Sequence, residues 1–136
     1  MKKTVSAIAF GLTSITGILL IIIGVRFFLV PQEAELAFGI KTATGADYSF
    51  HYIKGIRDLS VGVVVLIMLF ARTQRGLGIL LLTMTLVPLT DFLIVLNTPG
   101  HLTARLYPHL TAVVLCPLLG TYYLITSLKS SSNAAL

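Results

Sequence analysis

Four apolar stretches follow one another along the chain, with short polar links between them. They cover about residues 5–30, 50–71, 76–97 and 106–128. A helix of about 20 apolar residues is long enough to cross the roughly 30 Å of hydrocarbon in a bilayer. The pattern therefore predicts an all-α fold: a transmembrane four-helix up-down bundle that forms one integral membrane domain over residues 1–136. The small polar residues of 129–136 predict a disordered tail.

The composition supports a membrane protein. Hydrophobic residues make up 56% of the chain and charged residues only 11%, whereas a soluble domain carries about 25% charged residues. The formal net charge is +5, but the cations lie at the ends of the apolar stretches, as topology signals do. We therefore expect membrane lipids as partners, and no nucleic acid. A basic start before an apolar run also describes a signal peptide, but this run exceeds the usual 7–15 residues.

The distribution of charge predicts the orientation of the chain. One side of the predicted bundle carries cations without any acidic residue: Lys2, Lys3, Arg72, Arg75 and Lys129. On the other side, five cations are interleaved with all five acidic residues. Because cytoplasmic links carry an excess of Lys and Arg, we expect a multi-pass protein of the cell inner (plasma) membrane with both termini in the cytoplasm.

Small residues recur on one face of the first stretch. Ser6, Thr13, Gly17 and Gly24 share this face at about 100° per residue, and small residues allow helices to approach closely in lipid. We expect Gly17 and Gly24 to lie at a helix–helix contact. After this stretch, Gln32–Tyr48 is expected to form an ordered interfacial loop with a short helical turn at 33–38.

Three charged residues, Lys54, Arg57 and Asp58, lie close together at the head of the second stretch. A charge at mid-membrane costs roughly 2.5–3.5 kcal/mol on insertion scales, so such residues are usually paired and often functional. With His51 they fall within an arc of about 120° of the helix, so all four can face one cavity. The spacing of Lys54 and Asp58 also makes them an i,i+4 pair.

The up-down topology brings further polar residues to the same depth. Asp91 of the third stretch, His109 of the fourth and Arg26 of the first all fall in the outer half of the membrane. We expect Arg57 to pair with Asp91. Together the sequence predicts a polar pocket formed by Arg26, Lys54, Arg57, Asp58, Asp91 and His109.

Other interpretations of these residues remain open. The charges alone would also form a clamp between helices without any ligand, as buried charges usually pair. Taken singly, His51 is typical of an interfacial residue and His109 of a hydrogen-bonded residue near a helix start. No His or Cys pair has the spacing of metal ligands, so we expect no metal and no cofactor. Cys116 has the character of a small buried apolar residue.

Several short motifs support a family resemblance. They are Arg26-Phe-Phe-Leu-Val-Pro31, Phe38-Gly39-Ile40, Lys54-Gly-Ile-Arg57-Asp58-Leu59 with Gly62, and Val87-Pro88-Leu-Thr-Asp91. Over about residues 10–128 the chain resembles a family of small bacterial and fungal membrane proteins known as a domain of unknown function. More distantly it is similar to the DoxX-type four-helix membrane proteins. The resemblance implies a four-span fold with Arg26, Arg57, Asp58 and Asp91 as hallmark positions, and it implies no activity.

Four functions compete on this evidence. The leading hypothesis is a pocket that binds a small amphiphilic or lipid-like ligand, with Lys54 and Arg57 offered to an anionic group. A second is an intramembrane enzyme that uses Asp91 or Asp58 as an acid–base group on an isoprenoid-like or quinone-like substrate. A small oligomeric transporter and a scaffold without chemistry are the others. Whether the protein is an enzyme, and whether it forms a homo-oligomer, the sequence leaves open.

Overall fold

The computed structural model describes residues 2–43, 45 and 47–133. Within these residues the fold is all-α, as predicted, and no strand occurs. The helices are α1 (Lys2–Leu29), α2 (Pro31–Phe38), α3 (Ser49–Phe70), α4 (Gln74–Met84), α5 (Leu86–Asn97) and α6 (Leu106–Asn133), with a short 3₁₀ helix at Thr103–Arg105. The predicted turn at 33–38 is a two-turn helix that begins at Pro31, where proline suits the first helical position.

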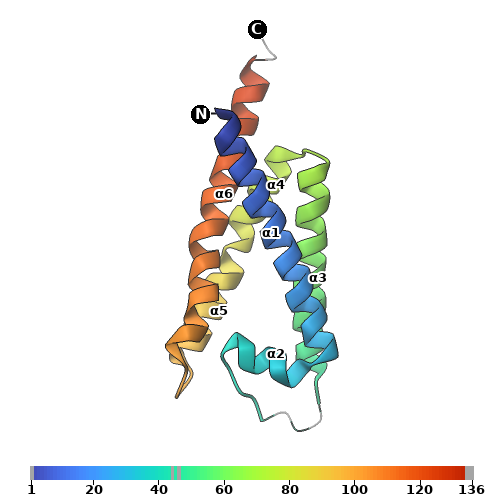
Figure 1. The fold of residues 1–136 in the computed structure, drawn as a ribbon, viewed down its shortest axis with the longest axis vertical. Coiled ribbons are helices and arrows are strands. Elements are labelled where there is room, and N and C mark those ends of the chain that lie inside the picture. Colours follow the sequence, from blue (N-terminus) through green and yellow to red (C-terminus); the bar gives the residue numbers. More distant parts are fainter. Residues whose placement is uncertain (1, 44, 46, 134–136) are drawn as a thin grey trace.

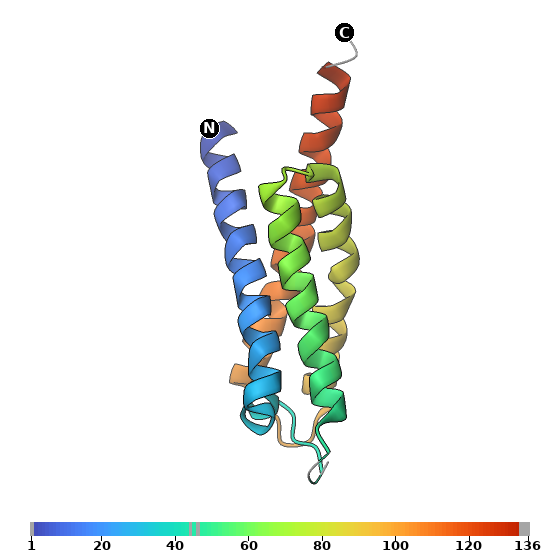
Figure 2. The same ribbon diagram turned by 90° about the vertical axis from the view of Figure 1, so that its right-hand side faces the viewer.

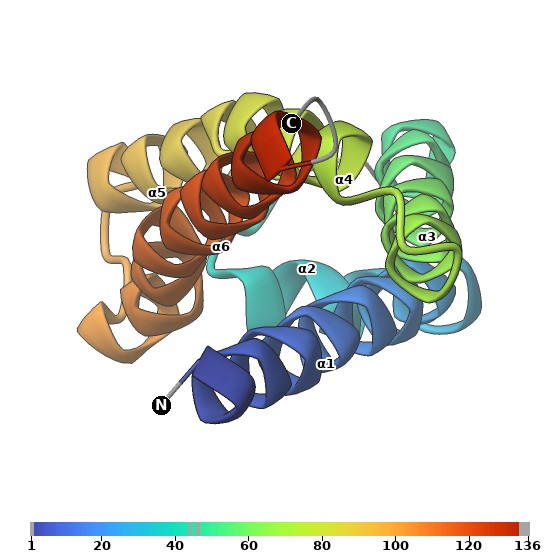
Figure 3. The ribbon, with the colours of Figure 1, turned by 90° about the horizontal axis from the view of Figure 1, so that it is seen from above.

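The long helices form two packed groups (Figure 1). α1 packs along α3, and α6 packs along α4 and α5. Seen from the end that carries the termini, the two groups lie on opposite sides, and α2 is visible between them at the far end (Figure 3). The chain therefore forms two helical layers, and α2 bridges them at one end only.

The third apolar stretch is broken into α4 and α5 at Thr85. Pro88 lies in the first turn of α5 and has no backbone N–H to donate to the carbonyl of Met84, four residues earlier. The helix therefore breaks just before the proline. At the other end of the chain, α6 continues to Asn133 and so includes part of the predicted disordered tail; residues 134–136 lie outside the described residues.

Three helical stretches are long and apolar enough to cross a membrane: Lys3–Leu29, Gln74–Asn97 and Thr103–Lys129. They indicate a membrane protein. α3 is also 22 residues long, but every 18-residue segment of it contains Lys54, Arg57 and Asp58. These three charges distinguish α3 from the three stretches that are apolar enough to cross a membrane. Many large apolar side chains on the outside of the long helices are exposed, as expected for surfaces that face lipid.

Glycines bring α1 and α3 into close contact, as the sequence predicted for Gly17 and Gly24. A β-carbon at Gly24 would lie 2.6 Å from the carbonyl oxygen of Gly55, and one at Gly17 would lie 2.7 Å from the side chain of Leu66. Thr13 is fully buried on the same face, and its hydroxyl bonds to that of Tyr123 in α6 at 3.1 Å. The predicted small-residue face is therefore a helix contact.

A second glycine contact joins α4 to α6. A β-carbon at Gly78 would lie 2.9 Å from the carbonyl oxygen of Gly120, and the reverse distance is 3.0 Å. Near the end with the termini, both groups also share one apolar core that includes Val65, Leu77 and Leu119. At this end the layers are fused, whereas the opposite end is bridged by α2.

The glycine contact gives a stability prediction with a matched control. Gly24→Leu should lower the melting temperature in detergent, because its β-carbon would also lie 2.6 Å from the backbone nitrogen of Leu59. Overpacking of this kind typically costs about 1–3 kcal/mol. Gly11→Leu on the same helix should change little, since nothing lies within 4 Å of a β-carbon there. Equal melting temperatures for the two variants would contradict the contact.

Candidate functional site

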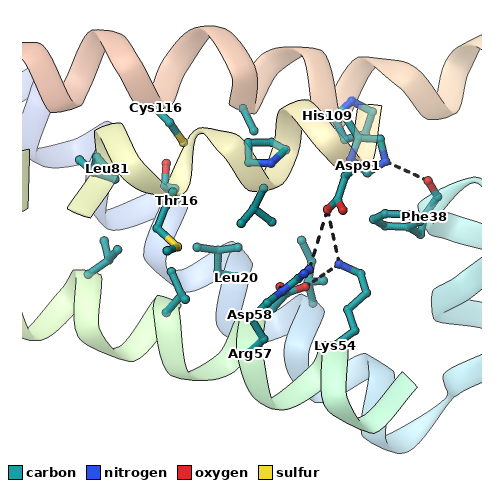
Figure 4. A pocket seen from close by; sticks show the side chains of 18 residues that line it. Thr16, Leu20, Phe38, Lys54, Arg57, Asp58, Leu81, Asp91, His109 and Cys116 are labelled. Carbon is teal, nitrogen blue, oxygen red and sulfur yellow. Dashed lines mark hydrogen bonds and ion pairs between the residues drawn. The ribbon is translucent and has the colours of Figure 1, made fainter. Parts of the chain in front are cut away.

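A cavity of about 180 Å³ lies between the two helical groups. Its walls are mostly apolar and come from every helix, with Leu20 of α1, Val61 of α3 and Leu81 of α4 among them. Charged and polar side chains gather toward the end nearest α2, as Figure 4 shows. Five of the six predicted pocket residues line this cavity: Lys54, Arg57, Asp58, Asp91 and His109. The cavity is therefore apolar along its length and polar at one end.

Asp58 is the best-paired charge of the site. Its Oδ2 lies 2.9 Å from Lys54 Nζ, and its Oδ1 lies 3.0 Å from Arg57 Nε. The side chain of Asp58 is only 7% exposed. Each carboxylate oxygen thus accepts a charge-assisted hydrogen bond from a different cation, the stronger class of hydrogen bond in proteins. Since all three residues lie on α3, this helix pairs its one carboxylate with two cations of its own and keeps a positive charge.

Asp91 of α5 is held much more loosely. Its Oδ2 lies 3.7 Å from Lys54 Nζ and 4.0 Å from Arg57 Nη2, and within the described chain it makes no side-chain hydrogen bond. The sequence predicted that Arg57 pairs with Asp91. This ion pair is present, but the carboxylate of Asp58 lies closer to Arg57. A second carboxylate therefore faces the cavity with unused hydrogen-bonding capacity (Figure 4).

Lys54 also contacts aromatic rings. Its Nζ lies 4.4 Å from the centre of the Phe38 ring and 5.1 Å from that of Phe27. A cation within about 6 Å of an aromatic face is attracted by the ring quadrupole. Lys54 is thus held by the carboxylate of Asp58 and by aromatic rings of α1 and α2, where the cavity meets α2.

α2 is attached over this end of the cavity by polar contacts. His109 Nε2 lies 2.9 Å from the carbonyl oxygen of Phe38, so the nitrogen must be the donor. Arg105 Nη1 donates to the carbonyl oxygen of Ala37 at 3.4 Å. Both contacts satisfy carbonyls in the last turn of α2, which no intrahelical donor reaches. His109 therefore has the hydrogen-bonded role that the sequence left open, and it also lines the cavity.

A buried ion pair joins α2 to α3. His51 Nε2 lies 2.6 Å from Glu35 Oε2, and both side chains are buried. Glu35 also accepts a hydrogen bond from the backbone N–H of Thr42. Burial raises the pKa of the Glu35 carboxyl, but the hydrogen bonds from His51 and Thr42 and the charge of His51 outweigh it, so that the pKa lies below its ordinary value.

Sequence reasoning missed this pair. The sequence predicts that His51 can face the same cavity as the charged residues of α3. In the structure His51 packs beside Phe27 and Tyr48 and does not line the cavity. Glu35 was assigned to an interfacial loop. The two residues are 16 positions apart on different helices, so no spacing rule links them. The burial of residues 34 and 35 is known only from the structure, and a two-turn helix is too short for its sequence pattern to predict it.

Arg26 is the sixth predicted residue, and the structure places it elsewhere. It is exposed in the last turn of α1 and does not line the cavity. A cation there favours the negative end of the helix dipole, and its long side chain can reach the head-group region. For metal binding, the described residues contain no group of three or more His, Cys, Asp or Glu that could hold an ion.

The model of the family called Domain of unknown function (DUF4267) matches residues 17–123.

The chain belongs to this family.

The match includes the charged cluster of the cavity, which consists of Lys54, Arg57, Asp58 and Asp91. No curated protein and no solved structure matches the chain.

The geometry predicts an order of importance among the acidic residues. Asp58→Ala would leave two cations without their close partner and should lower the free energy of unfolding by about 3–5 kcal/mol. Asp91→Ala should cost no more than about 1 kcal/mol, since its ion pairs are long. The measurement is unfolding by SDS in mixed micelles. In double-mutant cycles, coupling between Lys54 and Asp58 should exceed that between Arg57 and Asp91; the reverse order would contradict the geometry.

The Glu35–His51 pair predicts how the docking of α2 depends on pH. Because the pKa of Glu35 is lowered in the folded protein, its contribution is complete above the ordinary value of 4.5 and is lost as pH falls through the folded value. Hydrogen exchange of the α2 amides, corrected for intrinsic rates, should show protection falling over this acidic range. Glu35→Gln should abolish that dependence, whereas Glu33→Gln, at an exposed position on the same helix, should retain it. An identical profile in both variants would contradict the assignment.

Proposed function

We propose that this protein is a small integral membrane protein that binds a small amphiphilic or lipid-like molecule in the cavity beneath α2. The observation that carries the proposal is the division of the cavity into apolar walls and a charged end. An amphiphile has the same division. Its apolar part would lie against Leu20, Val61 and Leu81, and its polar group would lie between Lys54 and Asp91.

The chemistry of the charged end narrows the polar group. Lys54 and Arg57 balance Asp58 and Asp91, so the cluster is formally neutral. Lys54 has three N–H donors, and only one is used at short range, by Asp58. A group that accepts from Lys54 and donates to Asp91, such as a hydroxyl, fits this arrangement. A fully anionic group would gain from the cations but would meet repulsion from Asp91.

The size of the cavity limits how much of the ligand it holds. An engineered cavity of about 150 Å³ accommodates benzene, so about 180 Å³ holds a ring or a short length of chain. A longer tail would extend between the helices into the bilayer. We therefore propose that the protein recognises the polar end and the adjoining part of an amphiphile.

We also propose that the protein crosses the membrane four times, through α1, α3, the α4–α5 stretch and α6. α3 packs along α1, and its charges are paired through Asp58 within the helix, which lowers their cost in the membrane. The acid-free cations at the termini and near Arg72 favour a cytoplasmic location for both termini, in the plasma membrane.

Native mass spectrometry of protein purified in mild detergent tests the binding proposal. The wild type should retain an amphiphile of defined mass. Ala112→Phe should abolish retention, because Ala112 lines the cavity and the larger ring fills it. Asp91→Asn should fold normally but retain at least about tenfold less, as expected when a charge-assisted hydrogen bond is lost.

Leu118→Phe is the matched control, since Leu118 lies on the same helix but is 63% exposed. It should retain the amphiphile as the wild type does. If Ala112→Phe and Leu118→Phe retain equal amounts, the bound molecule lies outside the cavity and the proposal fails.

Reporter fusions test the proposed topology. A reporter active only in the cytoplasm should be active at either terminus and at the link between α3 and α4, because the sequence has cations and no acidic residue in these three segments. A reporter active only outside should work in the segment before Ser49. The opposite pattern would place the cavity at the cytoplasmic side and overturn the proposed orientation.

One observation favours a second candidate, an intramembrane enzyme. Within the described residues the carboxylate of Asp91 faces the cavity without a side-chain hydrogen bond, so a bound substrate could exchange a proton with it, as with a general acid or base. Conversion of a bound isoprenoid-like or quinone-like molecule that Asp91→Asn abolishes, with binding retained, would favour catalysis over simple binding.

A further inference from the structure

A second cavity, of about 540 Å³, lies at the end of the molecule that carries both termini. It is lined by residues at the start of α1, in and beside the turn between α3 and α4, and on α6; Figures 1 and 2 show where these elements lie at this end. Two cations, Lys3 and Arg72, line it together with the polar side chains of Ser6, Gln74 and Tyr122. Apolar side chains such as Phe10 and Met68 complete the walls.

Among the residues that the structure describes, the cations of this cavity have no counter-ion. Neither Lys3 nor Arg72 has an ion-pair or side-chain hydrogen-bond partner within the described part of the chain. All five acidic residues belong to the opposite half: Glu33, Glu35, Asp47, Asp58 and Asp91. The cavity therefore presents positive charge and hydrogen-bond donors without a carboxylate, which is the composition of an anion site.

The backbone at Arg72 is unusual for a residue with a side chain. Its φ is 56°, in the left-handed region, which glycine adopts most readily. The turn is held by hydrogen bonds from Arg72 N to Leu69 O at 3.1 Å and from Thr73 Oγ1 to Met68 O at 3.0 Å. Arg72 thus places a cation at a position whose backbone conformation is unfavourable for any residue with a side chain.

The cavity also lies at the level where lipid phosphates occur. Lys3 and Gln74 are the first residues of two membrane-length stretches, Lys3–Leu29 and Gln74–Asn97. The hydrocarbon region of a bilayer ends at such boundaries, and the head groups begin there. Basic pockets between transmembrane helices bind anionic lipid head groups at this level.

We propose that this cavity binds the phosphate of an anionic phospholipid, with Lys3 and Arg72 on either side of the phosphate. Tyr122 and Ser6 add hydroxyl donors, and the upper part of an acyl chain lies against Phe10 and Met68. The site is separate from the cavity beneath α2, so it stands whether or not that cavity binds an amphiphile.

The test uses the purified full-length protein and native mass spectrometry with three probes: phosphatidylglycerol, phosphatidylcholine and inorganic phosphate. The wild type should bind phosphatidylglycerol in preference to phosphatidylcholine. The double variant Lys3→Gln/Arg72→Gln should bind phosphatidylglycerol about 25-fold more weakly, since each cation near an anionic group contributes roughly a fivefold factor. Arg72→Gln alone should bind phosphatidylglycerol about fivefold more weakly. This single variant replaces the double variant in the test if the double variant does not fold.

The double variant Arg75→Gln/Lys129→Gln is the matched control, because it removes the same charge at the same end from exposed residues that do not line the cavity. It should bind phosphatidylglycerol within about twofold of the wild type. Equal losses in the two double variants would mean diffuse surface attraction and overturn the site. If phosphatidylglycerol binds no tighter than inorganic phosphate, the ligand is free phosphate and the lipid assignment is overturned.

Discussion

The pairing of Asp58 with two cations of its own helix is the interaction on which the proposed arrangement depends. Without it, α3 would carry three separate charges into a bundle of apolar helices, each costing roughly 2.5–3.5 kcal/mol at mid-membrane. With Lys54 at 2.9 Å and Arg57 at 3.0 Å, each oxygen of the carboxylate accepts from a different cation. One consequence follows for function: Asp91 is left as a second carboxylate with only long contacts, and it faces the cavity.

Glycines explain why there is a cavity for Asp91 to face. Close backbone contacts occur within each helical group, between Gly24 and Gly55 and between Gly78 and Gly120, and lipid provides no hydrophobic force that would close the space between the groups. The groups are fused through a shared core at one end and bridged by α2 at the other. The space between them remains apolar along its walls and charged beneath α2.

The sequence predicted most of what local rules determine. The all-α class, the glycine contact at Gly24 and the gathering of charges at one depth follow from composition and helical period. The predictions that failed concern contacts between helices, because sequence spacing does not determine which residues of two helices meet. Arg26 shares the predicted depth but points outward, and the Glu35–His51 pair joins a short helix to a long one. The predicted ion pair between Arg57 and Asp91 is present at 4.0 Å, but the pair with Asp58 is shorter, at 3.0 Å, and depth alone does not predict this order.

The central claim is that the charged cluster is the polar end of an occupied cavity and not a closed ion-pair clamp. A high-resolution density map of the protein purified with its native lipids tests this most directly. The account predicts elongated density that begins between Lys54 and Asp91 and continues along Val61 and Leu81, with Asp91 bonded to the bound molecule. A map in which Asp91 bonds directly to Arg57, with the side chains of both helical groups filling the space between, would contradict it.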